Sequence, residues 1–174
     1  MYENNMPDRR YRKTLSLMKT HLPAPARIMD LGVDNPFSEI MRKEGYTVDN
    51  TGGEDLDEEV SLAKATGYDA VTAFEILEHL LSPYTLLKSI EAPKLIISVP
   101  LNVWFSGPHR NPKDPRDNHY HEFYPYQMDW LLDKTGWKID HSETWTSPDR
   151  WRPGIRPLLR FIWPSYYFVV CSRK

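Results

Sequence analysis

The chain has 174 residues, of which 40% are hydrophobic and 26% charged, and its formal net charge at pH 7 is -2. This length and composition predict one soluble globular domain and exclude a disordered chain. The nearly balanced charge gives no indication of a nucleic-acid partner. The single cysteine, Cys171, excludes an internal disulfide and favours a reducing compartment.

The chain begins with polar residues, and no apolar run approaches the roughly 20 residues that a membrane span requires. We therefore expect a cytoplasmic protein without a secretion signal or a membrane span. Fifteen prolines and many aromatic residues, mostly in the second half of the chain, indicate long loops there.

Helix and strand patterns alternate along the chain. An apolar stripe predicts an N-terminal helix within residues 1–25, at Tyr11, Leu15, Met18 and Leu22. Apolar runs predict strands over 27–31, 46–50, 69–74, 94–100, from 137 and over 166–170. Helical spacing, capping residues and prolines predict helices over 37–43, 83–90 and 125–132. This alternation predicts an α/β fold with a mainly parallel sheet, in which residues 1–174 form one domain.

One stretch has the pattern of a strand, a tight turn and a helix. The apolar run that starts at Ala26 ends in Asp30-Leu31-Gly32, and helical spacing begins at Phe37. In open α/β sheets, ligands bind beyond the carboxyl ends of the strands, and a glycine there lets ligand and backbone approach closely. This turn is therefore the first candidate for a ligand site.

Three stretches together carry a family resemblance. They are Asp30-Leu31-Gly32, the run Phe-Glu-Ile-Leu-Glu-His-Leu over 74–80, and His-Tyr-His-Glu-Phe over 119–123. They resemble the class I S-adenosylmethionine-dependent methyltransferases, and within them the branch that acts on small molecules. The resemblance implies a Rossmann-like, doubly wound, mainly parallel sheet of seven strands with a last antiparallel strand. Since few residues separate Asp57 from Tyr68, we expect a reduction at the third strand.

The resemblance also implies that S-adenosyl-L-methionine is the cofactor, held at the carboxyl ends of the first, second and fourth strands. A carboxylate at Asp30 suits the cationic end of this cofactor, directly or through water. Gly32 and Val33 form the close turn. Phe74 and Glu75, which end the strand over 69–74, complete the expected cofactor-binding set.

An acid beyond the second strand is expected to accept hydrogen bonds from the ribose hydroxyls, as in dinucleotide-binding folds. Asp55 is the preferred candidate, and Glu54 and Asp49 are its rivals. The first turn departs from the Asp-x-Gly-x-Gly-x-Gly pattern of the family, because Asp34 and Pro36 replace the second and third glycines. Either this turn is rebuilt and still binds the cofactor, or affinity is lost.

Two segments, 101–122 and 146–164, are expected to cover the substrate side. The first is too long for a simple connection and is rich in polar and aromatic residues. His119 and His121 are the candidate catalytic bases, since imidazole titrates near neutrality. Trp104 in the same segment is expected to contact the substrate.

The second segment contains an arginine row on one face of a predicted helix. Its members are four residues apart, at Arg152, Arg156 and Arg160. On a surface helix such arginines are simply solvated. Beside a pocket they favour an anionic acceptor, so we expect Arg156 and Arg160 to bind substrate. The predicted activity is in-line methyl transfer to a small, anionic acceptor.

Three alternatives remain open from the sequence. A metal site is conceivable because hard or borderline ligands gather within nine positions, at Asp114, Asp117, His119, His121 and Glu122. The resemblance implies a metal-free segment here, and no metal is predicted. A degenerate module that binds S-adenosylmethionine or S-adenosylhomocysteine without catalysis is the second alternative. A nicotinamide dehydrogenase is the weakest, because the glycine fingerprint is missing. The acceptor and the oligomeric state are left open.

Overall fold

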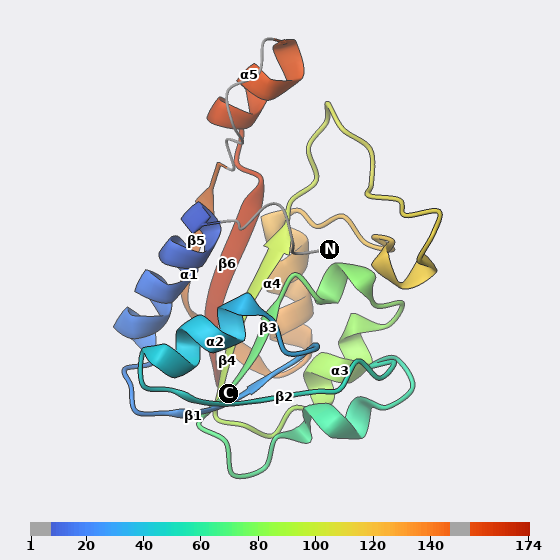
Figure 1. The fold of residues 1–174 in the computed structure, drawn as a ribbon. Coiled ribbons are helices and arrows are strands. Elements are labelled where there is room, and N and C mark those ends of the chain that lie inside the picture. The colour runs from blue at the N-terminus through green and yellow to red at the C-terminus, as the bar shows by residue number, and fades with distance from the viewer. Residues whose placement is uncertain (1–7, 147–153) are drawn as a thin grey trace.

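A six-stranded sheet with helices on both faces forms the centre of the computed structural model, which describes residues 8–146 and 154–174 (Figure 1). The strands are β1 Arg27–Asp30, β2 Thr47–Asn50, β3 Ala70–Phe74, β4 Lys94–Pro100, β5 Trp137–Trp145 and β6 Tyr166–Arg173. Their order across the sheet is β2-β1-β3-β4-β6-β5. The strands β1 to β4 pair in parallel, whereas β6 pairs antiparallel with both of its neighbours. The mainly parallel sheet and its last antiparallel strand are confirmed.

The helices are α1 Asp8–His21, α2 Pro36–Lys43, α3 Pro83–Ser89, α4 Pro125–Lys134 and α5 Ile155–Ile162, with short 3₁₀ helices η1 Val60–Lys64, η2 Leu77–His79 and η3 Pro115–Asp117. One face of the sheet packs against α1 and α2, and the other against η1, α3 and α4. Leu95 and Ile96 in β4 belong to the two different cores. The mostly apolar sequence of β4, in which consecutive residues are apolar, follows from this burial on both faces.

The expected seven strands are wrong, since the described residues contain six. Between β2 and β3 the chain forms turns and η1 but no strand. The short distance from Asp57 to Tyr68 leaves no length for a helix and a further strand. Consequently β2 is an edge of the sheet, and the reduction lies where the third strand was expected.

Helix α5 stands away from the sheet (Figure 1). None of its residues is buried, and Ile155, Leu158 and Ile162 are 79%, 58% and 69% exposed. The amphipathic helix predicted within 146–164 is therefore present, but its apolar side is open. Arg152 lies outside the described residues.

Two further observations bear on the expectations from composition. Cys171 is a buried free thiol in β6. Within the described ranges, no helix combines the length and the apolar character that crossing a membrane requires.

Candidate functional site

The glycine-poor turn after β1 is built as the N-terminal cap of α2. The Asn35 side chain accepts hydrogen bonds from two backbone N–H groups of that helix. Pro36 occupies the first turn of the helix, where a missing N–H leaves no bond unmade. The Asp34 carboxylate is exposed and accepts a hydrogen bond from Arg42 at 2.8 Å. The two residues that replace the family's glycines therefore rebuild the turn.

Gly32 has a backbone conformation that strains any residue with a side chain. Its φ is +114°, and a Cβ atom would lie 3.1 Å from Cδ1 of Ile76. Its backbone N–H donates a hydrogen bond to the Thr51 hydroxyl at 2.7 Å, which ties the ends of β1 and β2 together. The main chain is thus exposed to whatever occupies the space beside Gly32.

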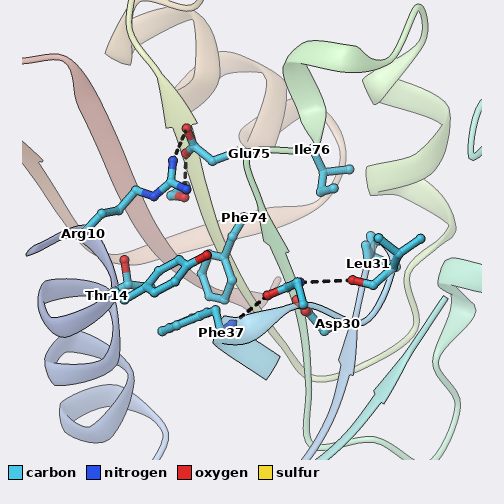
Figure 2. Close-up of a pocket in the computed structure, with 13 residues that line it drawn as sticks. Arg10, Thr14, Asp30, Leu31, Phe37, Phe74, Glu75 and Ile76 are labelled. Carbon is cyan, nitrogen blue, oxygen red and sulfur yellow. Dashed lines mark hydrogen bonds and ion pairs between the residues drawn. The ribbon is translucent and has the colours of Figure 1, made fainter. Parts of the chain in front are cut away.

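A small cavity of about 110 Å³ adjoins this turn (Figure 2). Its wall contains Arg10 and Thr14 from α1, Asp30 and Gly32 from the end of β1, and Glu75 from the end of β3. It therefore lies at the carboxyl edge of the parallel strands, which is where such sheets bind ligands.

Arg10 and Glu75 form an ion pair across the small cavity. Figure 2 shows the guanidinium reaching from α1 toward the carboxylate, and their closest N···O distance is 3.1 Å. The Ser98 hydroxyl donates a second hydrogen bond to Glu75 at 2.9 Å. Burial raises the pKa of Glu75, and the Arg10 charge and the Ser98 hydrogen bond oppose that rise. Glu75 also has a positive φ of 57°, an uncommon conformation that often marks functional sites.

Asp30 is buried in a hydrogen-bond network. Its carboxylate accepts from the Thr72 hydroxyl at 2.6 Å, and from Ser38 and Asn50 at 3.1 Å each. Burial raises the pKa of Asp30 to about 6, although these hydrogen bonds favour the ionised form. Asp30, which was expected at the cationic end of the cofactor, thus lines the small cavity, and its orientation is fixed by these hydrogen bonds.

A second, more open cavity of about 500 Å³ lies on the other side of the turn. It is formed by the connection after β2, by residues 75–81 and by the segment that contains η3. Its lining carries six carboxylates against one arginine, namely Glu54, Asp55, Asp57, Glu75, Asp114 and Asp117 against Arg116. The two cavities share four lining residues: Gly32, Val33, Glu75 and Ile76. They are therefore two compartments of one site centred on the turn.

The geometry distinguishes between the acids that were expected to bind the ribose. Asp55 and Glu54 both line the large cavity. Asp49 lines neither cavity and instead bonds to Arg27 and Tyr68. The structure thus leaves Asp55 and Glu54 as candidates, and the choice between them stays a prediction.

The two histidines expected as bases line neither cavity. The Nε2 atom of His121 lies 3.3 Å from the carbonyl oxygen of Leu81. The His119 ring packs edge-on against His79, with 4.9 Å between centroids. It is His79, from η2, that lines the large cavity. A catalytic role of His119 or His121 remains a prediction that this arrangement does not support.

The predicted substrate residues also lie away from the cavities. Trp104 is 68% exposed, and Arg156 and Arg160 lie on α5. None of the three lines either cavity. Of the two predicted substrate-side segments, 101–122 lines the large cavity, but the described part of 146–164 does not.

The metal-ligand set considered from the sequence does not assemble. Asp114 pairs with Arg116, and Glu122 accepts a hydrogen bond from Asn102. Among the described residues, one other group brings possible ligand atoms within 4.8 Å of one another, and its members are Glu78, His79 and His119.

Burial shifts the titration of all three members of this group. It lowers the pKa of His79 and, together with the neighbouring His79 and His109, lowers the pKa of His119 to about 4. Burial and the nearby Glu75 raise the pKa of Glu78 well above its usual range. Both imidazoles are therefore neutral at pH 7.

Sequence reasoning missed the contribution of α1. Arg10 and Thr14 line the small cavity, yet only the apolar stripe of this helix was recognised. The sequence did contain a signal for the position of Arg10. Arg10 directly precedes the buried Tyr11, so it lies at the border of the buried face.

Comparisons with known proteins agree with the geometry. Residues 2–142 match the methyltransferase domain family, and the chain belongs to it. A structure of an S-adenosylmethionine-dependent methyltransferase from Archaeoglobus fulgidus is similar over 94% of both chains, with 13% identity and a TM-score of 0.63. Among curated proteins, none matches this chain.

Two further similar structures contain cofactor or its product. The 1,6-didemethyltoxoflavin-N1-methyltransferase of Burkholderia thailandensis, with bound S-adenosylhomocysteine, shares 17% identity over 94% of this chain and 78% of its own, with a TM-score of 0.61. Phosphoethanolamine N-methyltransferase 2 of Haemonchus contortus, in complex with S-adenosylmethionine, shares 14% identity over 93% of this chain and 52% of its own, with a TM-score of 0.62. The class I S-adenosylmethionine-dependent methyltransferase recognised from the sequence is confirmed, and S-adenosyl-L-methionine is the cofactor of that class.

Proposed function

We propose that this protein transfers the methyl group of S-adenosyl-L-methionine to a small acceptor. The observation that carries the proposal is the turn at Gly32, whose backbone conformation disfavours a side chain and which borders both cavities. When bound, this cofactor supplies an electrophilic methyl group on a sulfonium. The protein then has to align the acceptor with that methyl group and exclude water.

The small cavity has the charges that suit the amino-acid end of the cofactor. The Arg10 guanidinium would attract the carboxylate of this end, and Asp30 and Glu75 would favour its ammonium group. The backbone at Gly32 would approach it closely. In the large cavity, Asp55 or Glu54 would accept hydrogen bonds from the ribose diol. Val33 and Phe74, which border the small cavity, complete the predicted cofactor set.

The acceptor is small and neutral or cationic in this proposal. Six carboxylates and one arginine line the large cavity, so an anion would meet a repulsive potential there. The arginine row that favoured an anionic acceptor lies on the exposed α5 and lines neither cavity. Two similar structures are named as methyltransferases of small molecules, 1,6-didemethyltoxoflavin and phosphoethanolamine, which supports a small acceptor.

The proposal is tested by binding and turnover on the full chain. Calorimetric titration is expected to show binding of both S-adenosylmethionine and S-adenosylhomocysteine. Release of S-adenosylhomocysteine is then measured over a panel of amines, neutral alcohols, carboxylates and phosphates, and the first two classes are expected to react. Tight binding without turnover of any class would support the degenerate binding module, and binding of neither cofactor form would reject both functions.

The charge preference has its own test. Replacing Arg156→Gln and Arg160→Gln together is expected to leave turnover of amines and neutral alcohols unchanged. If the double variant instead loses turnover selectively for carboxylates or phosphates, the acceptor is anionic, as expected from the sequence.

A further inference from the structure

The carboxylate of Glu78 is buried without a partner. The residue is 1% exposed, and neither of its carboxylate oxygens has a hydrogen-bond partner among the described residues. A buried ionised carboxylate without compensation is strongly unfavourable, and buried charges in proteins are paired or bind metals. Protonation does not by itself satisfy this carboxyl group, since the nearby Nε2 atom of His79 lies 3.8 Å away, beyond hydrogen-bond distance. The carboxylate therefore requires an explanation.

Two histidines present nitrogen atoms to the same space. The Nε2 atom of His79 lies 3.8 Å from a carboxylate oxygen of Glu78. Together with a ring nitrogen of His119, the three possible ligand atoms lie within 4.8 Å of one another. The cluster combines one carboxylate and two imidazoles, which is a ligand set found in catalytic zinc sites.

The orientation of His79 is fixed by its other ring nitrogen. Nδ1 lies 3.1 Å from the carbonyl oxygen of Asn118, and because a carbonyl only accepts, Nδ1 carries the proton. Nε2 is then left with a free lone pair that faces Glu78. Metal-binding histidines are typically held by such a hydrogen bond to a backbone carbonyl.

The backbone holds the two halves of the cluster together. The carbonyl oxygen of Glu78 accepts hydrogen bonds from the N–H groups of Tyr120 and His121, at 2.8 and 3.2 Å. These bonds fasten the end of the 101–122 segment to η2 and place His119 against His79. The three side chains thus come from η2 and from the 101–122 segment, which these backbone hydrogen bonds connect.

We propose that Glu78, His79 and His119 bind one divalent transition-metal ion, with Zn²⁺ as the representative ion. Two imidazoles and one carboxylate favour Zn²⁺ and Co²⁺ over Mg²⁺, which prefers an all-oxygen shell. Tetrahedral coordination at about 2.1 Å requires ligand atoms about 3.4 Å apart, so binding draws the cluster together. His79 also lines the large cavity, so the cluster adjoins the candidate site. This assignment departs from the metal-free site expected from the sequence, and it gives His119 a ligand role instead of a basic one.

The test is metal binding to the full chain after removal of metal by a chelator. Calorimetric titration with Zn²⁺ is expected to show one equivalent bound, and Co²⁺ is expected to give visible absorption bands of a four- or five-coordinate site. His79→Gln and His119→Gln are each expected to weaken Zn²⁺ binding by about tenfold or more. His121→Gln is the matched control, because this ring lies two positions from His119 and bonds elsewhere.

An NMR titration of the unmodified protein with Zn²⁺ gives a second test that does not depend on whether the variants fold. Zn²⁺ is expected to shift the ring ¹⁵N resonances of His79 and His119 and to leave those of His121 in place. Absence of Zn²⁺ binding at millimolar concentration, or equal weakening by His121→Gln, would overturn the proposal. Since no acceptor or methyl donor is present in these measurements, their outcome is independent of the proposed methyl transfer.

Discussion

The two cavities at Gly32 are built in different ways. The small one is walled by helix and strand residues of α1, α2, β1, β3 and β4, and its charged groups are held by partners, Glu75 by Arg10 and Asp30 by neutral hydrogen-bond donors. The large one is walled mainly by connecting segments and carries an excess of carboxylates. Rigid elements fix geometry, whereas connections vary more readily between relatives. In the proposed function, the contrast assigns the amino-acid end of the cofactor to the small cavity, and the ribose and the acceptor, which varies between relatives, to the large one.

The turn that the two cavities share gives the largest expected effect. Gly32→Ala places a Cβ atom 3.1 Å from Ile76 at a φ of +114°. We expect S-adenosylmethionine to bind about a hundredfold more weakly, or about 3 kcal/mol, because both compartments are affected. Calorimetry measures the loss. Gly107→Ala is the control, since a Cβ there meets no atom within 4 Å, and unchanged affinity in Gly32→Ala would refute the shared turn.

The buried Asp30 makes the small cavity sensitive to pH. Its pKa rises from 3.8 to about 6 on folding, so the folded protein holds this proton more tightly than the unfolded chain. The contribution of this group to stability is thus complete below about pH 4 and is lost as the pH rises through about 6. The loss corresponds to about 3 kcal/mol.

The measurement is the unfolding free energy of the protein without cofactor, by urea titration, between pH 4 and pH 7. Asp30→Asn does not ionise, so between these two pH values the difference in stability between this variant and the unmodified protein is expected to move by about 2 kcal/mol in favour of the variant. Effects of the histidines are common to both proteins and cancel. Parallel pH curves would show that Asp30 titrates normally.

Arg10 distinguishes the small cavity from the large one. Arg10→Gln leaves the half-buried Glu75 without its ion-pair partner, and we expect a loss of about 2 kcal/mol in stability, which is moderate because both side chains retain some exposure. Affinity for S-adenosylmethionine is expected to fall about tenfold. Arg9→Gln is the matched control, an exposed arginine on the same helix.

A second variant separates structure from binding. Adding Glu75→Gln to Arg10→Gln removes the unpaired carboxylate, so stability is expected to recover while affinity does not. Recovery of both would mean that Arg10 acts only through the fold.

The acids of the large cavity give the smallest expected effect. Asp55→Asn or Glu54→Gln, whichever removes the ribose acceptor, is expected to weaken S-adenosylhomocysteine about fivefold to tenfold without lowering the melting temperature. Asp49→Asn is the control, because this carboxylate lines neither cavity. If both acid variants bind S-adenosylhomocysteine as tightly as the unmodified protein does, the proposed ribose contact in the large cavity is wrong.

Much of the fold was predictable because its signals are local. The apolar run of β4 is long and buried on both faces, and the N-terminal stripe repeats at helical spacing, so α1 was found with nearly its observed end. The missing strand was predictable from the short segment between Asp57 and Tyr68. The turn was harder to judge, since Pro36 appeared to remove a donor and in fact begins a helix.

The site was less predictable because it depends on which segments meet. Arg10 is distant in sequence from Glu75, and no periodicity links a helix residue to the end of a strand five elements later. The arginine row of α5 was correct as a pattern, but amphipathicity does not say what a face contacts. His119 was selected for its chemistry, whereas its neighbours His79 and Glu78 give it a different environment.

Among the residues that the structure describes, no strand pairs with the outer side of β2, and this has a consequence for association between molecules. An edge strand offers unpaired backbone groups to any other extended chain, and proteins protect such edges by keeping them short and charged. Here β2 has four residues, and its Asp49 forms an ion pair with Arg27 beside it, with both side chains about half exposed. Because β2 is short and bears a charged side chain, it offers a docking strand little length to pair with, which disfavours edge-to-edge aggregation.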